Sequence, residues 1–247
     1  MLNASIDPDE IEKFSALADE WWDTEGSFRP LHKLNPTRLS YIRDNVFAQF
    51  RRHSKMNTPL EGIRVADIGC GGGLLTEPMA RLGAEVVGFD ASERNIMVAR
   101  NHSQRMCLDI DYRLATVESV VDAGERFDVV LNMEVVEHVA HFDRFLEACC
   151  ELVSPGGMMF VATLNRTLKS FAFAIAGAEY LLRWLPRGTH DWRKFVKPSE
   201  MASVIRRGGL TDIAFAGMVF DPFKNEWRID ERNLSVNYLA RAFRPNI

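Results

Sequence analysis

The chain has 247 residues, of which 47% are hydrophobic and 26% charged, and its formal net charge is −4. These values are typical of one large α/β domain over residues 1–247 and exclude a strongly basic protein, so we expect no nucleic-acid partner. No apolar run reaches the roughly 20 residues that span a bilayer, and no charged-then-apolar leader opens the sequence. The four cysteines show no metal or secreted-framework spacing. These features together predict a cytoplasmic location.

Two helices are expected to form an N-terminal helical cap over residues 1–58. Apolar residues at helical spacing predict the first helix over residues 8–22. It ends at Trp21-Trp22, a pair that would serve either as core anchors or as part of a lid over an aromatic or lipidic substrate. The second helix is expected over residues 35–53, because Asn35-Pro36 supplies a cap and a proline for the first turn.

Residues 64–73 read Arg-Val-Ala-Asp-Ile-Gly-Cys-Gly-Gly-Gly, which predicts a buried strand, a glycine turn and then a helix over residues 74–81. Such a turn presents bare backbone N–H groups and the positive end of a helix to a ligand. The next strand, over residues 84–90, ends in Asp90, which lies 21 residues after Gly69. An acid at about this distance binds a ribose diol in nucleotide sites, so the sequence predicts nucleoside binding at the carboxyl edge of a parallel sheet.

The loop differs from a dinucleotide fingerprint, because Leu74 stands three residues after Gly71, where that fingerprint has its last glycine. Asp67, at the end of the strand, would repel a pyrophosphate but suits a ligand with an ammonium and a sulfonium. The pattern resembles motif I of the class I S-adenosylmethionine (SAM) dependent methyltransferases. A nicotinamide-dependent oxidoreductase is the weaker alternative.

The rest of the chain continues the alternation of strands and helices. Helices are expected at 92–105, 143–153 and 199–207, and strands at 111–115, 127–133, 158–163, 210–219 and 235–243. This order predicts a doubly wound, mostly parallel, Rossmann-like sheet of seven strands. The last two strands would add a reversed hairpin at one edge.

Three ionisable residues follow the fourth strand, at the same edge as the glycine loop. If the segment is helical, Glu134 shares a face with Glu137 and with His138. The trio would then hold a divalent cation such as Mg²⁺ or supply a general base. The alternative is a solvent-facing helix start, where acids favour the helix dipole. His190 is a second candidate base.

Residues 165–197 are expected to form a helical insert after the fifth strand, where methyltransferases of this fold build the acceptor pocket. Its segment 171–185 carries two apolar stripes at helical spacing, with Lys169, Arg183 and Arg187 in or beside it. One interpretation is a helix buried by the C-terminal strands or in a dimer interface. The other is a helix lying in a membrane surface, with its basic residues on anionic headgroups.

With these residues in view, the chain resembles the ubiquinone biosynthesis O-methyltransferases. The shared motifs are Phe28-Arg-Pro-Leu-His, Asp67-Ile-Gly-Cys-Gly-Gly-Gly, Met133-Glu-x-x-Glu-His, Thr163-Leu-Asn-Arg and Gly188-Thr-His-Asp. The resemblance implies SAM-dependent methylation of 2-polyprenyl-6-hydroxyphenol and of 3-demethylubiquinol. Methylation of another small phenol, and a non-catalytic accessory subunit of a biosynthetic complex, are the remaining alternatives.

The resemblance also implies which residues form the site. By position, Arg38, Gly69, Asp90 and Met133 match SAM contacts of the family, and Asp67, Cys70 and Gly71 complete the expected cofactor loop. Arg38 would clamp the methionine carboxylate by a bidentate pair. The Glu134, Glu137 and His138 positions match the place where some relatives are thought to hold Mg²⁺. A lipid-tailed substrate favours a peripheral place on the inner face of an anionic membrane, beside other ubiquinone biosynthesis proteins.

Overall fold

A single eight-stranded sheet organises the part of the chain that the computed structural model describes, residues 5–53, 57–172, 191–221, 224 and 226–246. The strands are β1 (Arg64–Ile68), β2 (Glu85–Asp90), β3 (Asp111–Leu114), β4 (Phe127–Met133), β5 (Val153–Leu164), β6 (Thr211–Asp221), β7 (Glu226–Asp230) and β8 (Asn237–Phe243). Their order is β3-β2-β1-β4-β5-β8-β6-β7. The first five strands are parallel, which confirms the doubly wound prediction.

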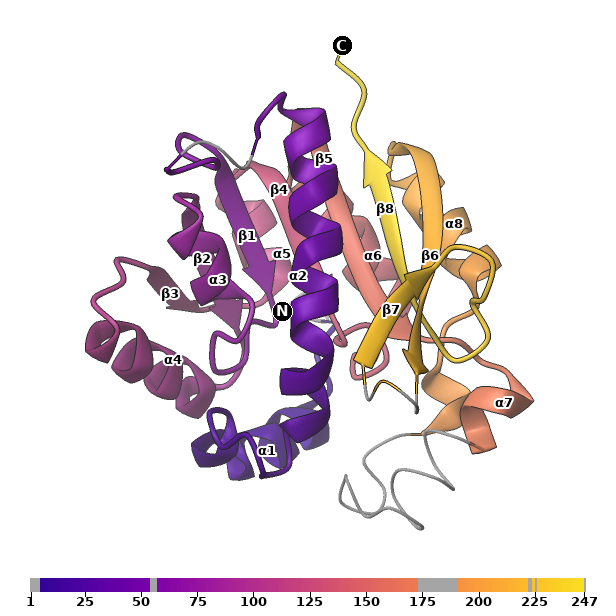
Figure 1. The fold of residues 1–247 in the computed structure, drawn as a ribbon, viewed down its shortest axis with the longest axis horizontal. Coiled ribbons are helices and arrows are strands. Elements are labelled where there is room, and N and C mark those ends of the chain that lie inside the picture. The colour runs from indigo at the N-terminus through magenta and orange to yellow at the C-terminus, as the bar shows by residue number, and fades with distance from the viewer. Residues whose placement is uncertain (1–4, 54–56, 173–190, 222–223, 225, 247) are drawn as a thin grey trace.

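Helices cover both faces of this sheet (Figure 1). They are α1 (Pro8–Ala16), η1 (Ala18–Glu20), α2 (Arg29–Gln49), α3 (Thr76–Arg81), α4 (Glu93–Arg105), α5 (Val117–Asp122), α6 (Phe142–Glu151), α7 (Leu168–Ser170), η3 (Trp192–Lys194) and α8 (Pro198–Arg207). Helices α2, α3 and α4 lie on one face, and α5, α6 and α8 lie on the other. The α1 helix lies across the end of the sheet at which the parallel strands finish.

The C-terminal strands run against the others. β8 pairs antiparallel with both β5 and β6, so the reversed hairpin was predicted correctly. The predicted count of seven strands is wrong, because β7 adds an eighth at the edge. Its sequence, Glu-Trp-Arg-Ile-Asp, alternates polar and apolar residues, and Trp227 and Ile229 pack against the core, so the pattern of a half-buried strand was present and was missed.

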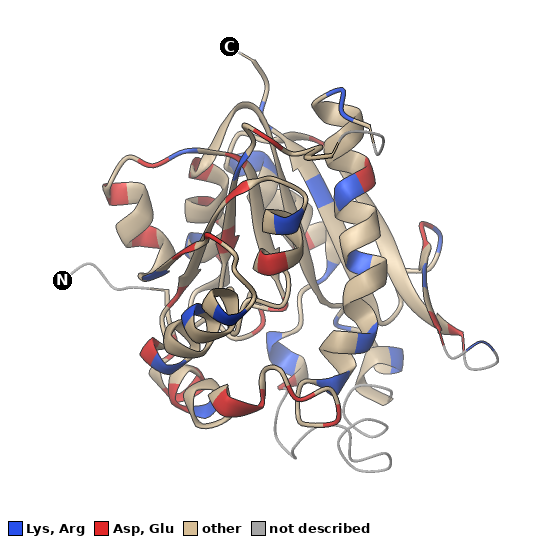
Figure 2. Cartoon of the chain, turned by 60° about the vertical axis from the view of Figure 1, so that its left-hand side comes forward, with Lys and Arg blue, Asp and Glu red and all other residues tan. Residues whose placement is uncertain are grey.

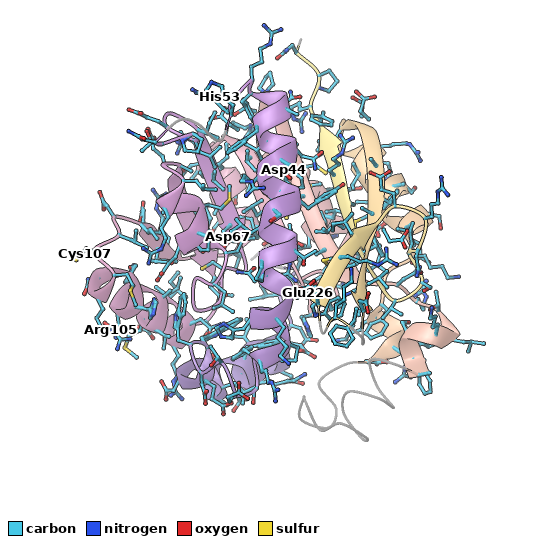
Figure 3. All side chains as sticks on the ribbon, viewed as in Figure 1. Asp44, His53, Asp67, Arg105, Cys107 and Glu226 are labelled. Atoms are coloured by element: carbon cyan, nitrogen blue, oxygen red, sulfur yellow. The ribbon has the colours of Figure 1, made fainter. Side chains whose placement is uncertain are left out.

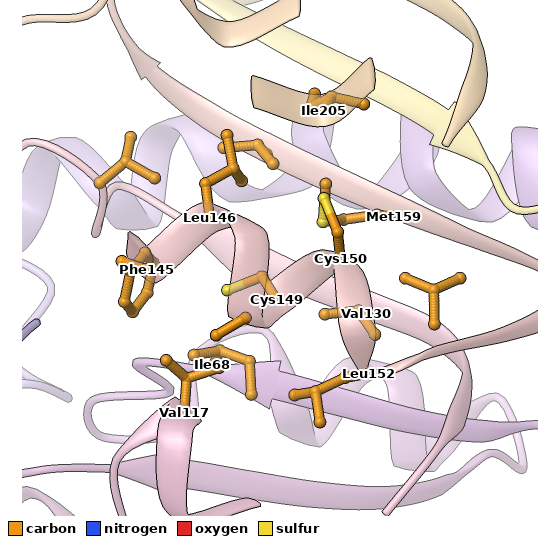
Figure 4. Close-up of a cluster of buried hydrophobic side chains, with 14 of the residues drawn as sticks. Ile68, Val117, Val130, Phe145, Leu146, Cys149, Cys150, Leu152, Met159 and Ile205 are labelled. Atoms are coloured by element: carbon orange, nitrogen blue, oxygen red, sulfur yellow. The ribbon is translucent and has the colours of Figure 1, made fainter. Parts of the chain in front are cut away.

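The core on the α6 face shows how the sequence pattern produces the packing (Figure 4). Phe145, Leu146, Cys149 and Cys150 form one stripe of the helix and are buried in the cluster that includes Met159 of β5. Burial of each large apolar side chain stabilises the fold by roughly 1.5–3 kcal/mol. Cys149 and Cys150 are therefore core residues, and all four cysteines are free thiols.

The two N-terminal helices differ from the predicted boundaries. The first ends at Ala16 and is followed by the short η1 turn. The second begins at Arg29, so Pro36 lies inside it. Asn35 does not cap this helix, because its side-chain Nδ2 donates to the Leu74 carbonyl at 2.7 Å. Packing of the buried α2 stripe against the sheet outweighs the hydrogen bond that a proline removes.

No helix among the described residues is both long enough and apolar enough to cross a bilayer. Acidic and basic residues are interspersed over the helices in the view of Figure 2. This mixture agrees with the small net charge of −4.

Candidate functional site

One cavity of about 740 Å³ follows the edge at which the parallel strands end. Asp90 lines it at the end of β2, Gly69 after β1, Glu134 after β4, and Leu164 at the end of β5. Asn237 also lies at this edge, because β8 is antiparallel and therefore begins where β5 ends. The cavity thus has two halves. We call the part over β2 and β1 the cofactor half and the part over β5, β8, β6 and β7 the acceptor half.

The glycine loop of the cofactor half needs its glycines for two reasons. Gly69, Gly71 and Gly73 have φ values of +72°, +54° and +90°, which side chains disfavour. Gly71 also packs under Trp21, since a Cβ there would lie 2.3 Å from the indole ring. Trp21 is a core anchor, since its ring stacks on that of Phe28 with centroids 3.7 Å apart, and it lines the cavity over the loop; the lid over an aromatic or lipidic substrate stays a prediction.

The Asp90 carboxylate is held in place by three hydrogen-bond donors. Its Oδ2 accepts from the Gly71 N–H at 2.9 Å, and its Oδ1 accepts from the Ser92 N–H at 2.8 Å and from Asn95 Nδ2 at 3.2 Å. Asn95 in turn accepts from Trp21 Nε1 at 2.9 Å. Burial raises the pKa of Asp90, although these hydrogen bonds oppose the rise. The carboxylate lines the cavity where the ribose of a nucleoside would bind.

Arg38 and Asp67 lie beneath the loop rather than in the cavity wall. Arg38 Nη2 donates to Glu134 Oε1 at 2.7 Å, and its buried Nε has no partner among the described residues. Asp67 accepts from Thr76 Oγ1 at 2.6 Å and lies in the interior beside α2 (Figure 3). Burial raises the pKa of Asp67 to about 6, against the opposing effects of Thr76 and the Arg38 charge. The unsatisfied Arg38 N–H is the feature that a carboxylate would complete.

The other two predicted cofactor residues are separated by the fold. Met133 lines the cavity at the end of β4. The Cys70 side chain instead packs with Ile96, Ala99 and Tyr112 under α4, outside the cavity wall. Cys70 would therefore contribute to a bound cofactor through its backbone.

The segment after β4 is not helical, which corrects the prediction that its ionisable residues share a helix face. Residues 134–140 form bends and turns, and Glu134 has a φ of +57° that a right-handed helix cannot contain. Glu134 pairs with Arg38, Glu137 accepts from Thr163 Oγ1 at 2.8 Å, and His138 Nδ1 lies 2.9 Å from Glu10 Oε2. Glu134 and Glu137 also interact with each other, whereas His138 pairs with Glu10.

These pairings set different charges on the carboxyl groups. Burial, followed by the charge of Glu134, raises the pKa of Glu137 well above its usual range, which favours a neutral carboxylic acid. Glu10 is different: burial opposes ionisation there, but the hydrogen bond and charge of His138 lower its pKa to about 2. A Glu10 carboxylate that accepts from Nδ1–H leaves the proton-accepting lone pair of a neutral imidazole on Nε2.

The predicted Mg²⁺ site does not fit this arrangement. Among the described residues there is no group of three or more His, Cys, Asp or Glu side chains placed to hold a metal ion. We therefore derive no chemical step through a metal.

One predicted residue lies outside the part of the chain that the structure describes, and two residues of the site were not predicted. His190 lies outside the described residues, so its role as a second base stays a prediction. Glu10 and Asn95 were missed. Asn95 follows Asp90 by five residues at the start of α4, which is a usable signal. No sequence signal pointed to Glu10, because 128 residues separate it from His138.

The comparisons with known proteins agree with this geometry. A family model described as a methyltransferase domain matches residues 66–161. The ubiquinone biosynthesis O-methyltransferase of Cereibacter sphaeroides is 56% identical over 98% of this chain and 98% of its own length. The enzymes of that name from Dinoroseobacter shibae and Brucella anthropi are 55% and 56% identical, each over 98% of this chain and 97% of its own length. The chain belongs to the ubiquinone biosynthesis O-methyltransferase family.

Solved structures support the fold of this family member. Magnesium protoporphyrin IX methyltransferase from Synechocystis, with bound S-adenosylhomocysteine (SAH), has a TM-score of 0.63 at 18% identity, covering 96% of this chain and 93% of that protein. A SAM-dependent methyltransferase from Thermotoga maritima has a TM-score of 0.61 at 17% identity, covering 95% of this chain and 98% of that protein. The predicted class I SAM methyltransferase fold is confirmed.

Proposed function

We propose that this family member is the SAM-dependent O-methyltransferase of ubiquinone synthesis, acting on 2-polyprenyl-6-hydroxyphenol and on 3-demethylubiquinol. The observation that carries the proposal is the continuity of the cavity, which joins a nucleoside-type loop to an apolar half at the Met133–Glu134 junction. The relatives supply the choice of acceptor, because three enzymes of that name match almost the whole chain. Methylation of another small phenol is the alternative that the experiment below tests.

Each residue of the cofactor half would bind a different part of SAM, the methyl donor. Asp90 would bind the ribose hydroxyls, since its carboxylate lines the cavity and is fixed by Gly71 and Ser92. Arg38 would bind the methionine carboxylate through its unsatisfied N–H. Asp67, ionised above pH 6, would balance the cationic ammonium. When bound, SAM supplies a methyl group on a sulfonium that becomes a neutral thioether once the methyl leaves.

The acceptor must lose a proton to become a good nucleophile. A phenol with a pKa near 10 is ionised to about one part in a thousand at pH 7, so a base that removes this cost contributes up to roughly 4 kcal/mol. We assign this role to His138, which lines the cavity and is oriented by Glu10. The phenol oxygen then bonds to the methyl carbon as the carbon–sulfur bond breaks, and the phenol proton goes to the imidazole.

The lipid tail of the acceptor supports a peripheral place on an anionic membrane. Leu168 and Phe171, which open the insert, are 82% and 47% exposed although they are large and apolar. Lys169 lies between them and also lines the cavity. Exposed apolar residues with a basic neighbour are typical of membrane-surface segments. The tail would then leave the cavity beside the insert.

Co-sedimentation with vesicles tests the membrane contact. Replacement of Leu168 and Phe171 by serine should reduce binding to phosphatidylglycerol vesicles several-fold. The matched control replaces Met97 and Met106, two exposed apolar residues of the α4 region, by serine and should bind like wild type. Equal binding by both double variants would reject the contact.

The function itself is tested with radiolabelled SAM and acceptors that carry a short isoprenoid tail. Transfer of label to both a demethylubiquinol and a 6-hydroxyphenol analogue is expected. Transfer to an untailed phenol with equal efficiency would favour the alternative of another small phenol. Label that stays on the donor with every acceptor would overturn the proposed function.

A further inference from the structure

The acceptor half contains one buried amide whose hydrogen bonding is incomplete. Asn237, the first residue of β8, is 6% exposed and lines the cavity. Its Oδ1 is buried and has no hydrogen-bond partner among the described residues. Among the described residues that line the cavity, only Asn237 has a buried side-chain atom without a hydrogen-bond partner.

The apolar surroundings of Asn237 make its unpaired Oδ1 unfavourable. Its neighbours in the sheet register are Leu164 and Met218, and Trp227 lines the same half. The nearby polar residues satisfy each other, since Ser235 Oγ donates to Asn233 Oδ1 at 2.6 Å. A buried polar atom without a partner is unfavourable. Because the Asn237 side chain lines the cavity, its incompletely hydrogen-bonded amide is expected to serve a ligand.

The amide is not needed to hold the fold locally. The backbone of β8 is already paired on both sides, with β5 and with β6. Asn237 does not cap a helix, and no hydrogen bond of its side chain ties it to another described element. Its position at the cavity edge, one strand beyond Leu164, places it beyond the β4 junction on the side away from Asp90.

The proposed acceptors share one feature that an amide can recognise. Each carries a hydroxyl on the ring carbon next to the hydroxyl that is methylated. We propose that Asn237 is a specificity-determining residue whose amide hydrogen-bonds this neighbouring ring oxygen; the proposal rests on the proposed function. The neighbouring O–H donates to Oδ1, and Nδ2–H remains available to a methoxy or carbonyl oxygen. The bond fixes which ring oxygen faces the donor methyl group.

The test compares two acceptors that differ only in this oxygen, a short-tailed 6-hydroxyphenol and the matched phenol without the neighbouring hydroxyl. Replacement Asn237→Leu should lower kcat/KM for the first acceptor about 10- to 100-fold and change kcat/KM for the second less than about threefold. Asn237→Ser, which retains a hydroxyl, should lose less. Ser235→Ala is the matched control, because that hydroxyl is already satisfied, and it should leave both values within about twofold of wild type.

Calorimetric SAH affinity is measured for every variant, and unchanged affinity reports an intact fold. Equal losses on both acceptors, or no loss on either, would overturn the role of Asn237 while leaving the proposed function in place. A wild-type protein that binds SAH but methylates neither acceptor would overturn the proposed function, and the specificity role would fail with it.

Discussion

The two halves of the cavity are built by different means. In the cofactor half, polar groups are already fixed: Asp90 receives hydrogen bonds from Gly71, Ser92 and Asn95 before any ligand binds. In the acceptor half, the wall is mainly apolar and its buried amide, Asn237, is open. The difference teaches that the cofactor half fixes its polar groups before a ligand binds, whereas the acceptor half offers mainly apolar surface, which suits the lipid-tailed acceptor proposed above.

The strongest test of this comparison is at the junction between the halves. His138→Ala should lower kcat about 100-fold or more, because general-base catalysis typically contributes 10²–10⁴-fold. SAH affinity, measured by calorimetry, should stay within a few-fold. Glu10→Gln should give a smaller loss of kcat and move the pH–rate profile, since the imidazole loses its carboxylate partner. An unchanged profile in both variants would remove His138 from the reaction.

Binding by the cofactor half is tested most directly at Asp90. We expect Asp90→Ala to weaken SAH binding about 100-fold, because the carboxylate is the group that would hold both ribose hydroxyls. Calorimetry measures this loss. Asp111→Ala, which removes an exposed carboxylate at the start of β3, is the control and should bind like wild type. Normal binding by Asp90→Ala would contradict the ribose assignment.

Asp67 gives the comparison a pH dependence. Its pKa is raised from 3.8 to about 6. At a pH between these two values, the Asp67 carboxyl is therefore protonated in the folded state and ionised in the unfolded state. Asp67 therefore contributes least to stability above pH 6 and most below pH 3.8. Asp67→Asn should gain stability relative to wild type, by about 2–3 kcal/mol, as pH rises through this window. Urea unfolding at pH 4.5 and 7 measures the gain, and a constant difference between the two pH values would refute it.

Trp21 sharpens the comparison, because it joins the N-terminal segment to the cofactor loop. Trp21→Phe keeps a ring over Gly71 but removes the hydrogen bond to Asn95. SAH affinity should fall about three- to tenfold, in line with a loss of roughly 1 kcal/mol. Trp227→Phe, in the acceptor half, should leave SAH affinity unchanged. If the two variants lose affinity equally, the halves are not independent.

The smallest expected effect concerns metal. Because Glu134, Glu137 and His138 are engaged by Arg38, Thr163 and Glu10, EDTA treatment should change the rate of methyl transfer by less than about twofold. The assay is run with and without added Mg²⁺. A rate that EDTA abolishes and Mg²⁺ restores would show that these pairings rearrange around an ion.

Sequence reasoning was strong for the cofactor half and weak for the acceptor half, for physical reasons. Strand β4 was predicted at its observed bounds, and α4 was predicted over residues 92–105 where the structure has Glu93–Arg105, since local apolar runs and the Ser92 cap specify them. The partners of Arg38 and His138 come from distant parts of the chain, so spacing could not give them. The helix start predicted at Asn35-Pro36 was wrong, because tertiary packing overrides a local helix-start signal. The alternation of polar and apolar residues in β7 is a strand signal that was available in the sequence and was missed.

The two binding tasks belong to different parts of the chain, because the reversed direction of β8 brings its first residue, Asn237, to the cavity edge beside the end of β5. The principal groups of the cofactor half all precede residue 139, whereas the strands that form the acceptor wall lie after residue 152. Recombination between homologues at the start of β5 would therefore exchange the acceptor wall as one block. Such chimaeras should inherit their ring and tail preference from the C-terminal parent and their methyl-donor affinity from the N-terminal parent.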